Sequence, residues 1–411
     1  MEVDPMSVLA LNAGSSTLKF SLFAGRSAES TAEGIVEEPP AQAGGSARDV
    51  PRATLRLRRT GTPGERSAML EAGLSDAVRA VVEALREELV SDPVVAVGHR
   101  VVHGGRAFTE SVAIDARVTR EIARLSELAP LHNPPALAAI RAAQEAIPGG
   151  VHVAVFDTAF FADLPPDRHV YPLPYAWYAE HGIRRFGFHG ISHAYCAGRA
   201  PEFLGRAPDG FRSVTCHLGN GCSATAARGG TAVATTMGFT PLEGLMMGSR
   251  AGSIDPGIVL HALERMSLTP AELGEVLQKR SGLLGVSGIS SDFRTVQEAA
   301  RKGNERASLA LAIYANAVRA AIGSLSVALG GIDALVFTAG VGENAAGLRA
   351  EVCRGLECLA LHIDPGRNRT LRPDADVAAP GSPGRILVLR TREDLHIARE
   401  ALRVAGTRGT P

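Results

Sequence analysis

The sequence predicts an α/β protein whose sheets are at least partly parallel. Short apolar segments rich in β-forming residues alternate along the chain with longer Ala/Leu/Arg segments of helical period. Two glycine-rich turns that are far apart in the sequence share one pattern, in which the turn follows an apolar segment. At 411 residues the chain is long enough for two or three domains. The simplest account is two related domains, each opening with a strand–turn–strand hairpin.

The expected elements follow this alternation in order. Because the segment between residues 37 and 67 is rich in Pro, Gly and Arg, it is expected to be a loose surface excursion. Strands are expected over 7–14, 94–105, 151–161, 211–221, 333–340 and 384–391. Helices are expected over 75–90, 134–147, 269–282 and 305–330.

Charge and cysteine usage restrict the class of partner and the compartment. The formal net charge is zero, so no general field attracts nucleic acid or an anionic membrane, and small molecules are the expected partners. The 5 cysteines are odd in number and lack a C-x-x-C spacing, which indicates reduced thiols. The acidic N-terminus lacks the basic region of a signal peptide. A cytoplasmic location is therefore expected.

The two glycine-rich turns are candidate phosphate sites. Glycine lets backbone N–H groups approach a ligand closely, and hydroxyl or amide side chains add donors for phosphate oxygens. Two ordinary tight hairpins are the alternative. No P-loop motif is present. The residues concerned are Asn12, Gly14, Ser15 and Ser16 near the N-terminus, and Asn220, Gly221, Cys222 and Ser223 further on.

A third glycine-rich segment, "FTAGVGENA", fits two interpretations. Gly340, Gly342 and Ala345 match the G-x-G-x-x-A dinucleotide fingerprint between a predicted strand and a predicted helix. The motif lies late in the chain, however, and lacks a clear acidic strand end about 20 residues on. Backbone amides at this turn are equally suited to an adenosine or its α-phosphate.

Several polar side chains lie at the ends of apolar segments, where α/β proteins bind ligands. Asp157 is either a helix cap or a magnesium ligand. Arg100 and Arg250, among small residues, are suited to grip a carboxylate or phosphate, although isolated arginines are more often structural. The i, i+4 pair of His189 and His193 could suggest a metal site, but an imidazole donating to a phosphoryl group is the preferred interpretation. His132, His217 and the compact charge of Lys19 are similar candidates.

Together these segments resemble the acetate kinase family, within the superfamily of acetate and sugar kinases, heat-shock ATPases and actin. The resemblance runs in order over nearly the whole chain. It is carried by "LALNAGSSTLKF", "GHRVVHGG", "LAPLHNPP", "VFDTAFF", "FGFHGISH", "HLGNGCSA", "MGFTPLEGLMMGSRAGSIDPG", "SGISSDFR", "FTAGVGENA" and "RTREDLHIARE".

The resemblance implies transfer of the ATP γ-phosphoryl group to acetate, giving acetyl phosphate and ADP. Arg100, Arg250, His189 and Asp157 would act in catalysis, and Val102, Leu131, His132, Phe188 and Pro241 would bind the acid together with Arg100. Magnesium, with manganese as an alternative, would lie at Asn12, Asp157 and Glu393. Nucleotide and phosphate would be held by Asn12, Ser15, Ser16, Thr17, Lys19, His217, Leu218, Gly219, Asn220, Gly221, Asp292, Phe293, Arg294, Gly340, Val341, Gly342 and Asn344.

The implied architecture is two actin-like (ribonuclease H-like) domains related by duplication, with the active-site cleft between them. The domains would span 1–155 plus 396–411, because the C-terminal helix returns to the first half, and 156–395. A homodimer is also implied. One residue departs from the usual family sequence next to the proposed metal ligand. Arg392 precedes Glu393, and an ion pair between them could compete with metal binding.

Two other functions compete with an acetate kinase. A propionate or butyrate kinase is the nearest, because one methylene in an apolar pocket changes discrimination by only about 1–3 kcal/mol. A nucleotide-binding sensor without turnover belongs to a different class; Arg100, Asp157, His189 and Arg250 argue against it.

Overall fold

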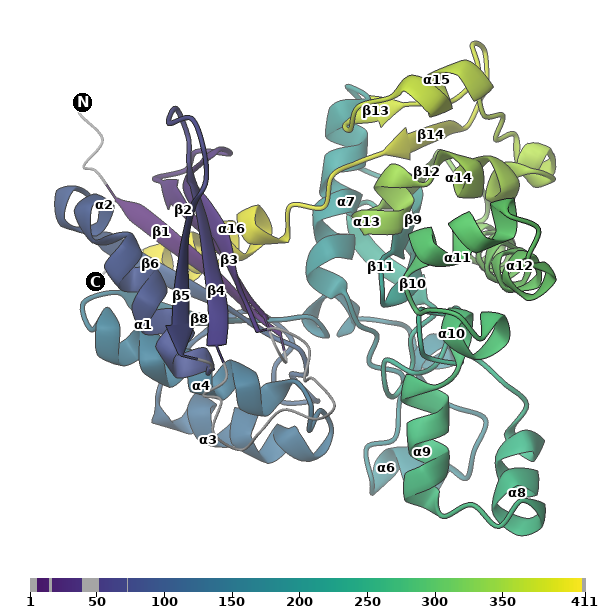
Figure 1. Ribbon diagram of the computed structural model, residues 1–411, viewed down its shortest axis with the longest axis horizontal. Helices are drawn as coiled ribbons and strands as arrows, with labels where there is room; N and C mark the ends of the chain where they lie inside the picture. The colour runs from purple at the N-terminus through teal and green to yellow at the C-terminus, as the bar shows by residue number, and fades with distance from the viewer. Residues whose placement is uncertain (1–5, 15–16, 39–51, 72, 409–411) are drawn as a thin grey trace. The chain divides into compact units, whose positions relative to one another are not determined.

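The computed structural model describes residues 6–14, 17–38, 52–71 and 73–408. The chain forms two compact units, Met1–Ala162 with Arg392–Pro411, and Asp163–Thr391 (Figure 1). These units differ from the expected domains at both crossings. Residues 156–162 and 392–395 belong to the first unit, because a 3-10 helix packs on the strand ending at Phe156 and the C-terminal helix begins at Glu393.

The first unit contains an eight-stranded mixed sheet in the order β5-β4-β3-β2-β1-β6-β8-β7. Parallel pairing joins β1, β6 and β8, and the other neighbours are antiparallel. Its strands are β1 (Ser7–Ala13), β2 (Thr17–Ala24), β3 (Ser30–Glu37), β4 (Arg52–Arg59), β5 (Arg66–Glu71), β6 (Val94–Val101), β7 (Val112–Ala113) and β8 (Val151–Phe156). Its helices are α1 (Leu74–Ala84), α2 (Arg86–Ser91), α3 (Ala116–Arg124), η1 (Leu125–Glu127), α4 (Asn133–Ala146), η2 (Ala159–Phe161) and α16 (Glu393–Arg408).

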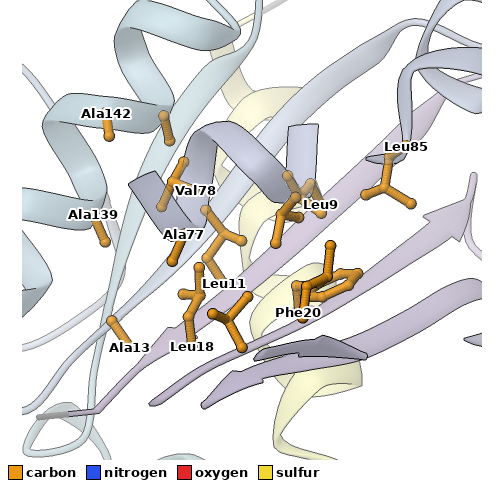
Figure 2. Packing of buried hydrophobic residues seen from close by; sticks show 14 of the residues in the cluster. Leu9, Leu11, Ala13, Leu18, Phe20, Ala77, Val78, Leu85, Ala139 and Ala142 are labelled. Atoms are coloured by element: carbon orange, nitrogen blue, oxygen red, sulfur yellow. The ribbon is translucent and has the colours of Figure 1, made fainter. Parts of the chain in front are cut away.

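Helices cover both faces of the parallel part of this sheet. On one face α1 and α4 bury the apolar side chains that alternate along β1 and β2. On the other face α16 packs on β1, β6 and β8, so the C-terminal helix belongs to the first unit, as the resemblance implied. The core on the α1 and α4 face includes Leu9, Leu11, Leu18, Phe20, Ala77, Val78, Ala139 and Ala142 (Figure 2).

The expectation of a loose excursion between residues 37 and 67 is wrong for part of that segment. Residues 52–59 form β4, which pairs with β3 and β5. The reason is period-two alternation: Ala53, Leu55 and Leu57 are buried, while the alternate positions are three exposed arginines and a half-buried threonine. The high arginine content concealed this pattern. Residues 39–51 lie outside the described residues.

A buried pair of histidines lies in the sheet of the first unit. His99 Nε2 and His152 Nδ1 are 3.0 Å apart, and His152 Nε2 lies 3.0 Å from the carbonyl oxygen of Ile147. These contacts fit two neutral rings. His99 donates its Nε2–H to Nδ1 of His152, and His152 donates its Nε2–H to the carbonyl oxygen of Ile147. Burial holds the pKa of His99 well below its ordinary value, and it lowers the pKa of His152 as well.

This pair predicts a loss of stability in acid. Because the folded pKa of His99 is depressed, the stabilisation is complete above the unfolded pKa of about 6.5 and is lost as the pH falls below it. When the pH is lowered from about 7.5 to 5.5, the free energy of unfolding of the wild type should fall by about 1.4 kcal/mol more than that of His99→Gln. Urea denaturation at both pH values measures this. His261→Gln, at an exposed position, is the control, and equal acid sensitivity of wild type and His99→Gln would contradict the assignment.

The second unit contains a six-stranded mixed sheet in the order β11-β10-β9-β12-β14-β13. It is covered by α12 on β9, β10 and β11, and by α7, which contacts β9, β10, β11 and β12. The strands are β9 (Arg212–Leu218), β10 (Cys222–Arg228), β11 (Thr231–Thr235), β12 (Ala334–Thr338), β13 (Ala375–Asp376) and β14 (Arg385–Val388). The helices are α5 (Pro166–His169), α6 (Tyr175–Ala179), α7 (Gly190–Phe203), α8 (Pro256–Arg265), α9 (Pro270–Lys279), α10 (Gly282–Ser287), α11 (Phe293–Arg301), α12 (Glu305–Leu329), α13 (Ala339–Asn344), α14 (Ala346–Cys353), η3 (Leu356–Leu359) and α15 (Pro365–Thr370).

The two sheets share one topology over five strands. The order β3-β2-β1-β6-β8 corresponds to β11-β10-β9-β12-β14, with an antiparallel hairpin followed by parallel strands in both. The predicted hairpins and the relation between the halves are therefore confirmed. The hairpin registers also correspond. Asn12 pairs with Lys19 one position before the last pair of its hairpin, and His217 pairs with Ser223 at the same position of the other hairpin, so Asn12 is equivalent to His217.

Within the described residues, α12 is the one helix long and apolar enough to cross a membrane by length and composition. Its apolar residues pack on the sheet of the second unit and on α10, α11 and α14. This packing is typical of a core helix in a protein of this class.

Candidate functional site

The first unit brings four of the predicted residues into one polar cluster. Arg100 donates through Nε and Nη2 to Oδ2 of Asp157, at 3.1 and 2.6 Å, and through Nη1 to Oδ1 of Asn12 at 3.1 Å. Asn12 Nδ2 donates to Oε2 of Glu393 at 2.9 Å. The cluster lies where parallel strands end and α16 begins. Strand alternation places Asn12 and Arg100 on the face of the sheet that α16 covers.

Two carboxylates and one guanidinium meet in this cluster. Burial opposes the charge on Arg100, but the carboxylates of Asp157 and Glu393 outweigh it and hold the pKa of Arg100 above its ordinary value. Arg392 donates to Oδ1 of Asp394 at 3.2 Å and to the carbonyl of Ala28 at 3.0 Å. The expected competition of Arg392 for Glu393 is therefore not observed.

The donor set of the cluster fits a magnesium ion that is completed by substrate. Among the described residues no group of three or more His, Cys, Asp and Glu side chains is arranged to hold a metal. Magnesium is commonly bound through one or two carboxylates, with phosphate oxygens and waters filling the other positions. Asp157 and Glu393, with the amide of Asn12, match that requirement. Asp157 is not the cap of the following 3-10 helix, whose N-cap is Thr158.

The first glycine-rich turn follows this cluster. Lys19 on β2 pairs directly with Asn12 on β1 and is exposed, while Thr17 is half-buried at the start of β2. Gly14 N–H donates to the carbonyl of Thr17 at 2.7 Å, which closes the turn. Ser15 and Ser16 lie outside the described residues.

The second unit holds two stacked imidazoles, those of His189 and His217. Their ring centroids are 4.4 Å apart, with 25° between the planes. His189, just before α7, has a left-handed backbone with φ of 58°, and its ring lies against Gly221. A Cβ at Gly221 would lie 3.1 Å from Nε2 of His189, so the glycine allows this approach.

Arg250 extends this second cluster. Its Nη1 donates to the carbonyl of Pro241 at 3.3 Å, and the same atom lies 3.8 Å from the place that a Cβ of Gly221 would occupy. In the described part of the chain no carboxylate lies within ion-pairing distance of Arg250. Burial lowers the pKa of Arg250 from its ordinary value. A half-buried guanidinium without a carboxylate is suited to bind an anion.

A pocket with a volume of about 820 Å³ opens in the second unit beside the turn at Gly219. Its walls come from the β9–β10 turn, α10, α11, α12 and α13. Eight of the seventeen residues predicted to hold nucleotide and phosphate line it, including all three of Asp292, Phe293 and Arg294. The lining residues are Gly219, Asn220, Leu283, Ser291, Asp292, Phe293, Arg294, Gln297, Tyr314, Gly340, Val341, Asn344 and Ala345.

Some predicted nucleotide residues do not line this pocket. Leu218 is fully buried in β9, and Gly342 packs against Phe337 and the carbonyl of Cys216. Gly342 therefore packs under the turn, and the neighbouring residues Gly340, Val341 and Asn344 line the pocket. Tyr314 and Gln297 were missed, because helical periodicity makes Tyr314 indistinguishable from a core aromatic residue.

Asp292 and Arg294, which both line the pocket, also form an ion pair with each other. The Asp292 carboxylate caps α11 by accepting from the N–H groups of Arg294 and Thr295, and it pairs with the Arg294 guanidinium at 3.0 Å. These contacts lower the pKa of Asp292, with the hydrogen bond from Arg294 as the largest cause. The wall of the pocket at this point is therefore charged and ordered at the start of a helix.

The residues expected around the acid come from both units. Val102 is buried, Leu131 is exposed and His132 is half-buried in the first unit. Phe188 is buried directly before His189, and Pro241 accepts from Arg250, in the second unit.

Gly340 permits a direct test of the pocket. A Cβ at this position would meet nothing within 4 Å, and the backbone φ is not in the left-handed region, so a side chain there would extend into the pocket. Gly340→Leu should raise the KM for ATP by about 10-fold or more, a loss of about 1.4 kcal/mol, with little change in the KM for the acid. Steady-state kinetics measures both constants. Gly274→Leu, in open space on α9, is the control, and an unchanged KM for ATP would exclude this pocket as the nucleotide site.

Known proteins match this chain over nearly its whole length. The model of the acetokinase family matches residues 7–399. An acetate kinase of Gloeobacter violaceus is 47% identical over 405 residues, which cover 96% of this chain and 98% of that protein. The crystal structure of Porphyromonas gingivalis acetate kinase is 38% identical, with a TM-score of 0.87 over 97% of this chain and 99% of that one. A propionate kinase from Francisella tularensis is 36% identical, with a TM-score of 0.87 over 97% of this chain and 100% of that one. The chain belongs to the acetokinase family.

Proposed function

We propose that the protein is an ATP-dependent acetate kinase, which transfers the γ-phosphoryl group of ATP to the carboxylate of acetate and also runs in reverse. The observation that carries this function is Arg250, a half-buried guanidinium that no described carboxylate reaches, beside the stacked rings of His189 and His217. The Gly219–Gly221 turn that these side chains border also forms one wall of the 820 Å³ pocket. A nucleotide in that pocket has its phosphates within reach of an anion site.

The chemistry requires few groups of the protein. A carboxylate needs no general base to act as a nucleophile, so positioning and neutralisation of charge supply most of the catalysis. Arg250 and His189 are placed to stabilise charge on the transferring phosphoryl group. Arg100 is assigned to the acid carboxylate, and its bonds to Asp157 and Asn12 hold it in place.

Asp157 and Glu393, with Asn12, would hold magnesium, or manganese in its place, which neutralises phosphate charge when bound. The residues of the chain therefore hold a negative site ready beside a fixed arginine.

Propionate is the competing acid. The similarity to a propionate kinase is nearly as great as that to an acetate kinase in the two crystal structures compared. The apolar residues assigned to the acid methyl are of the acetate type by resemblance: Val102, Leu131, Phe188 and Pro241, with His132 as a further residue assigned to the acid. Because a methylene is worth only about 1–3 kcal/mol, acetate should be preferred without strict rejection of propionate.

A cytoplasmic homodimer is the proposed form of the enzyme. The balanced net charge supports a small-molecule enzyme without nucleic acid or membrane partners. Ile258 and Leu260 on α8 and Leu309 on α12 are more than half exposed, and apolar side chains of this kind are typical of subunit interfaces. Light scattering of the purified protein measures its mass.

The proposed function is tested by trapping acyl phosphate with hydroxylamine. Purified protein is incubated with ATP, magnesium and either acetate, propionate or butyrate. Product that is greatest with acetate and falls with each added carbon supports an acetate kinase. Product that is greatest with a longer acid keeps the reaction and overturns the substrate. ATP binding without product from any acid would favour a nucleotide sensor.

A further inference from the structure

We propose that two buried serines, Ser192 and Ser223, are positioning residues that set the tautomers of His217 and His189, so that both rings present Nε2–H to the phosphoryl group. The phosphoryl group in this statement rests on the proposed function, whereas the tautomers themselves follow from the contacts. Both serine side chains are 0% exposed, and each lies against Nδ1 of one of the two stacked rings.

Ser192 holds His217. Ser192 Oγ lies 2.8 Å from Nδ1 of His217, and Thr391 Oγ1 donates to the same oxygen at 2.9 Å. A hydroxyl carries one proton. Among the described residues, the contacts of Ser192 Oγ are with the Thr391 hydroxyl, from which it accepts, and with Nδ1 of His217, so Nδ1 is the acceptor that is left for the serine proton. With Nδ1 as an acceptor, the proton of the His217 ring lies on Nε2.

Ser223 holds His189 in the same way. Ser223 Oγ lies 2.9 Å from Nδ1 of His189 and 2.7 Å from Nε2 of His193. Its single proton goes to one ring, and it accepts from the other. Burial holds the pKa of His193 well below its ordinary value, so that ring is neutral and has one N–H to give.

The environment of His189 selects between the two directions. When His193 donates to Ser223 and Ser223 donates to His189, Nε2 of His189 is protonated. The opposite direction would point an Nε2 lone pair at the space beside Gly221 and Arg250. That lone pair would repel an anion held by Arg250, so we assign the first direction.

The arrangement therefore supplies two N–H donors of fixed direction, from rings whose centroids are 4.4 Å apart, next to Arg250. Donors of fixed direction at the place where charge develops are worth more than mobile ones. Groups that orient a functional histidine through its other nitrogen usually change activity by about 10- to 100-fold when removed.

Nitrogen-15 NMR of histidine-labelled protein tests the assignment directly. In the wild type, the spectra should show Nε2 protonated and Nδ1 unprotonated for both His189 and His217. Ser223→Ala and Ser192→Ala should shift the signals of His189 and His217, respectively, and lower kcat by about 10- to 100-fold with little change in either KM. Ser223→Thr and Ser192→Thr keep the hydroxyl and should restore the wild-type pattern.

Thr225→Val is the matched control, because it removes another buried hydroxyl from β10, where Ser223 also lies. A wild-type proton on Nδ1 of either ring would overturn the proposal, as would alanine variants that lose turnover with unchanged nitrogen signals. Wild-type protein with the assigned tautomers but without acyl phosphate formation would refute the proposed function and leave the tautomer assignment standing.

Discussion

Replacing Arg250 by alanine is expected to lower kcat for acyl phosphate formation by about 10²- to 10⁵-fold, the range spanned by oxyanion donors and arginine fingers. Arg250 is a half-buried cation whose nearest partners are a carbonyl oxygen and the sulfur of Met247. Since its charge is not neutralised by a carboxylate in the described residues, it is available to an anion at the Gly221 turn. Stopped assays at saturating ATP and acetate measure kcat.

Two controls separate charge from structure in this experiment. Arg250→Lys keeps the charge but loses the planar fork and should recover only part of the activity. Arg306→Ala removes an arginine that, like Arg250, donates to backbone carbonyls, and it should leave kcat within about 2-fold of the wild type. Near-normal turnover of Arg250→Ala at saturating substrates would remove Arg250 from the transition state.

Arg100→Ala should lower kcat within the same range of about 10²- to 10⁵-fold, for a reason that includes its neighbours. Arg100 is bonded to Asp157 and Asn12, so its removal leaves the buried Asp157 carboxylate without its partner. Unlike Arg250→Ala, this variant should also lower the free energy of unfolding. Equal stability of Arg100→Ala and wild type in urea denaturation would contradict that difference.

Gly98→Val is expected to lower the free energy of unfolding by about 3 kcal/mol, the upper end of the usual cost of overpacking. A Cβ on Gly98 would lie 2.5 Å from Cγ2 of Ile397 and 2.9 Å from its carbonyl oxygen. The carbonyl belongs to the backbone of α16, so side-chain rotation cannot relieve the contact. The strand or the helix must move, and α16 begins with Glu393, which Asn12 holds.

Urea denaturation measures this loss, with Gly149→Val as the control because a Cβ at Gly149 meets nothing within 4 Å. Gly98→Val should also raise the magnesium concentration needed for half-maximal activity, because displacement of α16 moves the proposed magnesium ligand Glu393 away from Asn12. Wild-type stability of Gly98→Val would mean that α16 does not pack on β6 as described.

Local patterns determined much of the fold. Each strand and helix expected from periodicity is present, because an element of this length carries its own alternation or helical stripe. The two hairpins were predictable, since a glycine-rich turn between apolar segments needs no distant partner. β4 was missed because its exposed face is almost entirely arginine, and shorter elements such as β7, β11, β13 and the helices α3 and α8 were not predicted either.

The sequence by itself determined the family, the class of fold and the residue types of the site, since motifs and periodicity are local properties of the chain. Only the tertiary structure decided which arginine is neutralised and which is available, because Asp157 reaches Arg100 and no described carboxylate reaches Arg250. It also decided the equivalence of Asn12 and His217, which depends on sheet register. The contacts of Ser192 and Ser223 depend in the same way on distances between residues far apart in sequence, which no local pattern specifies.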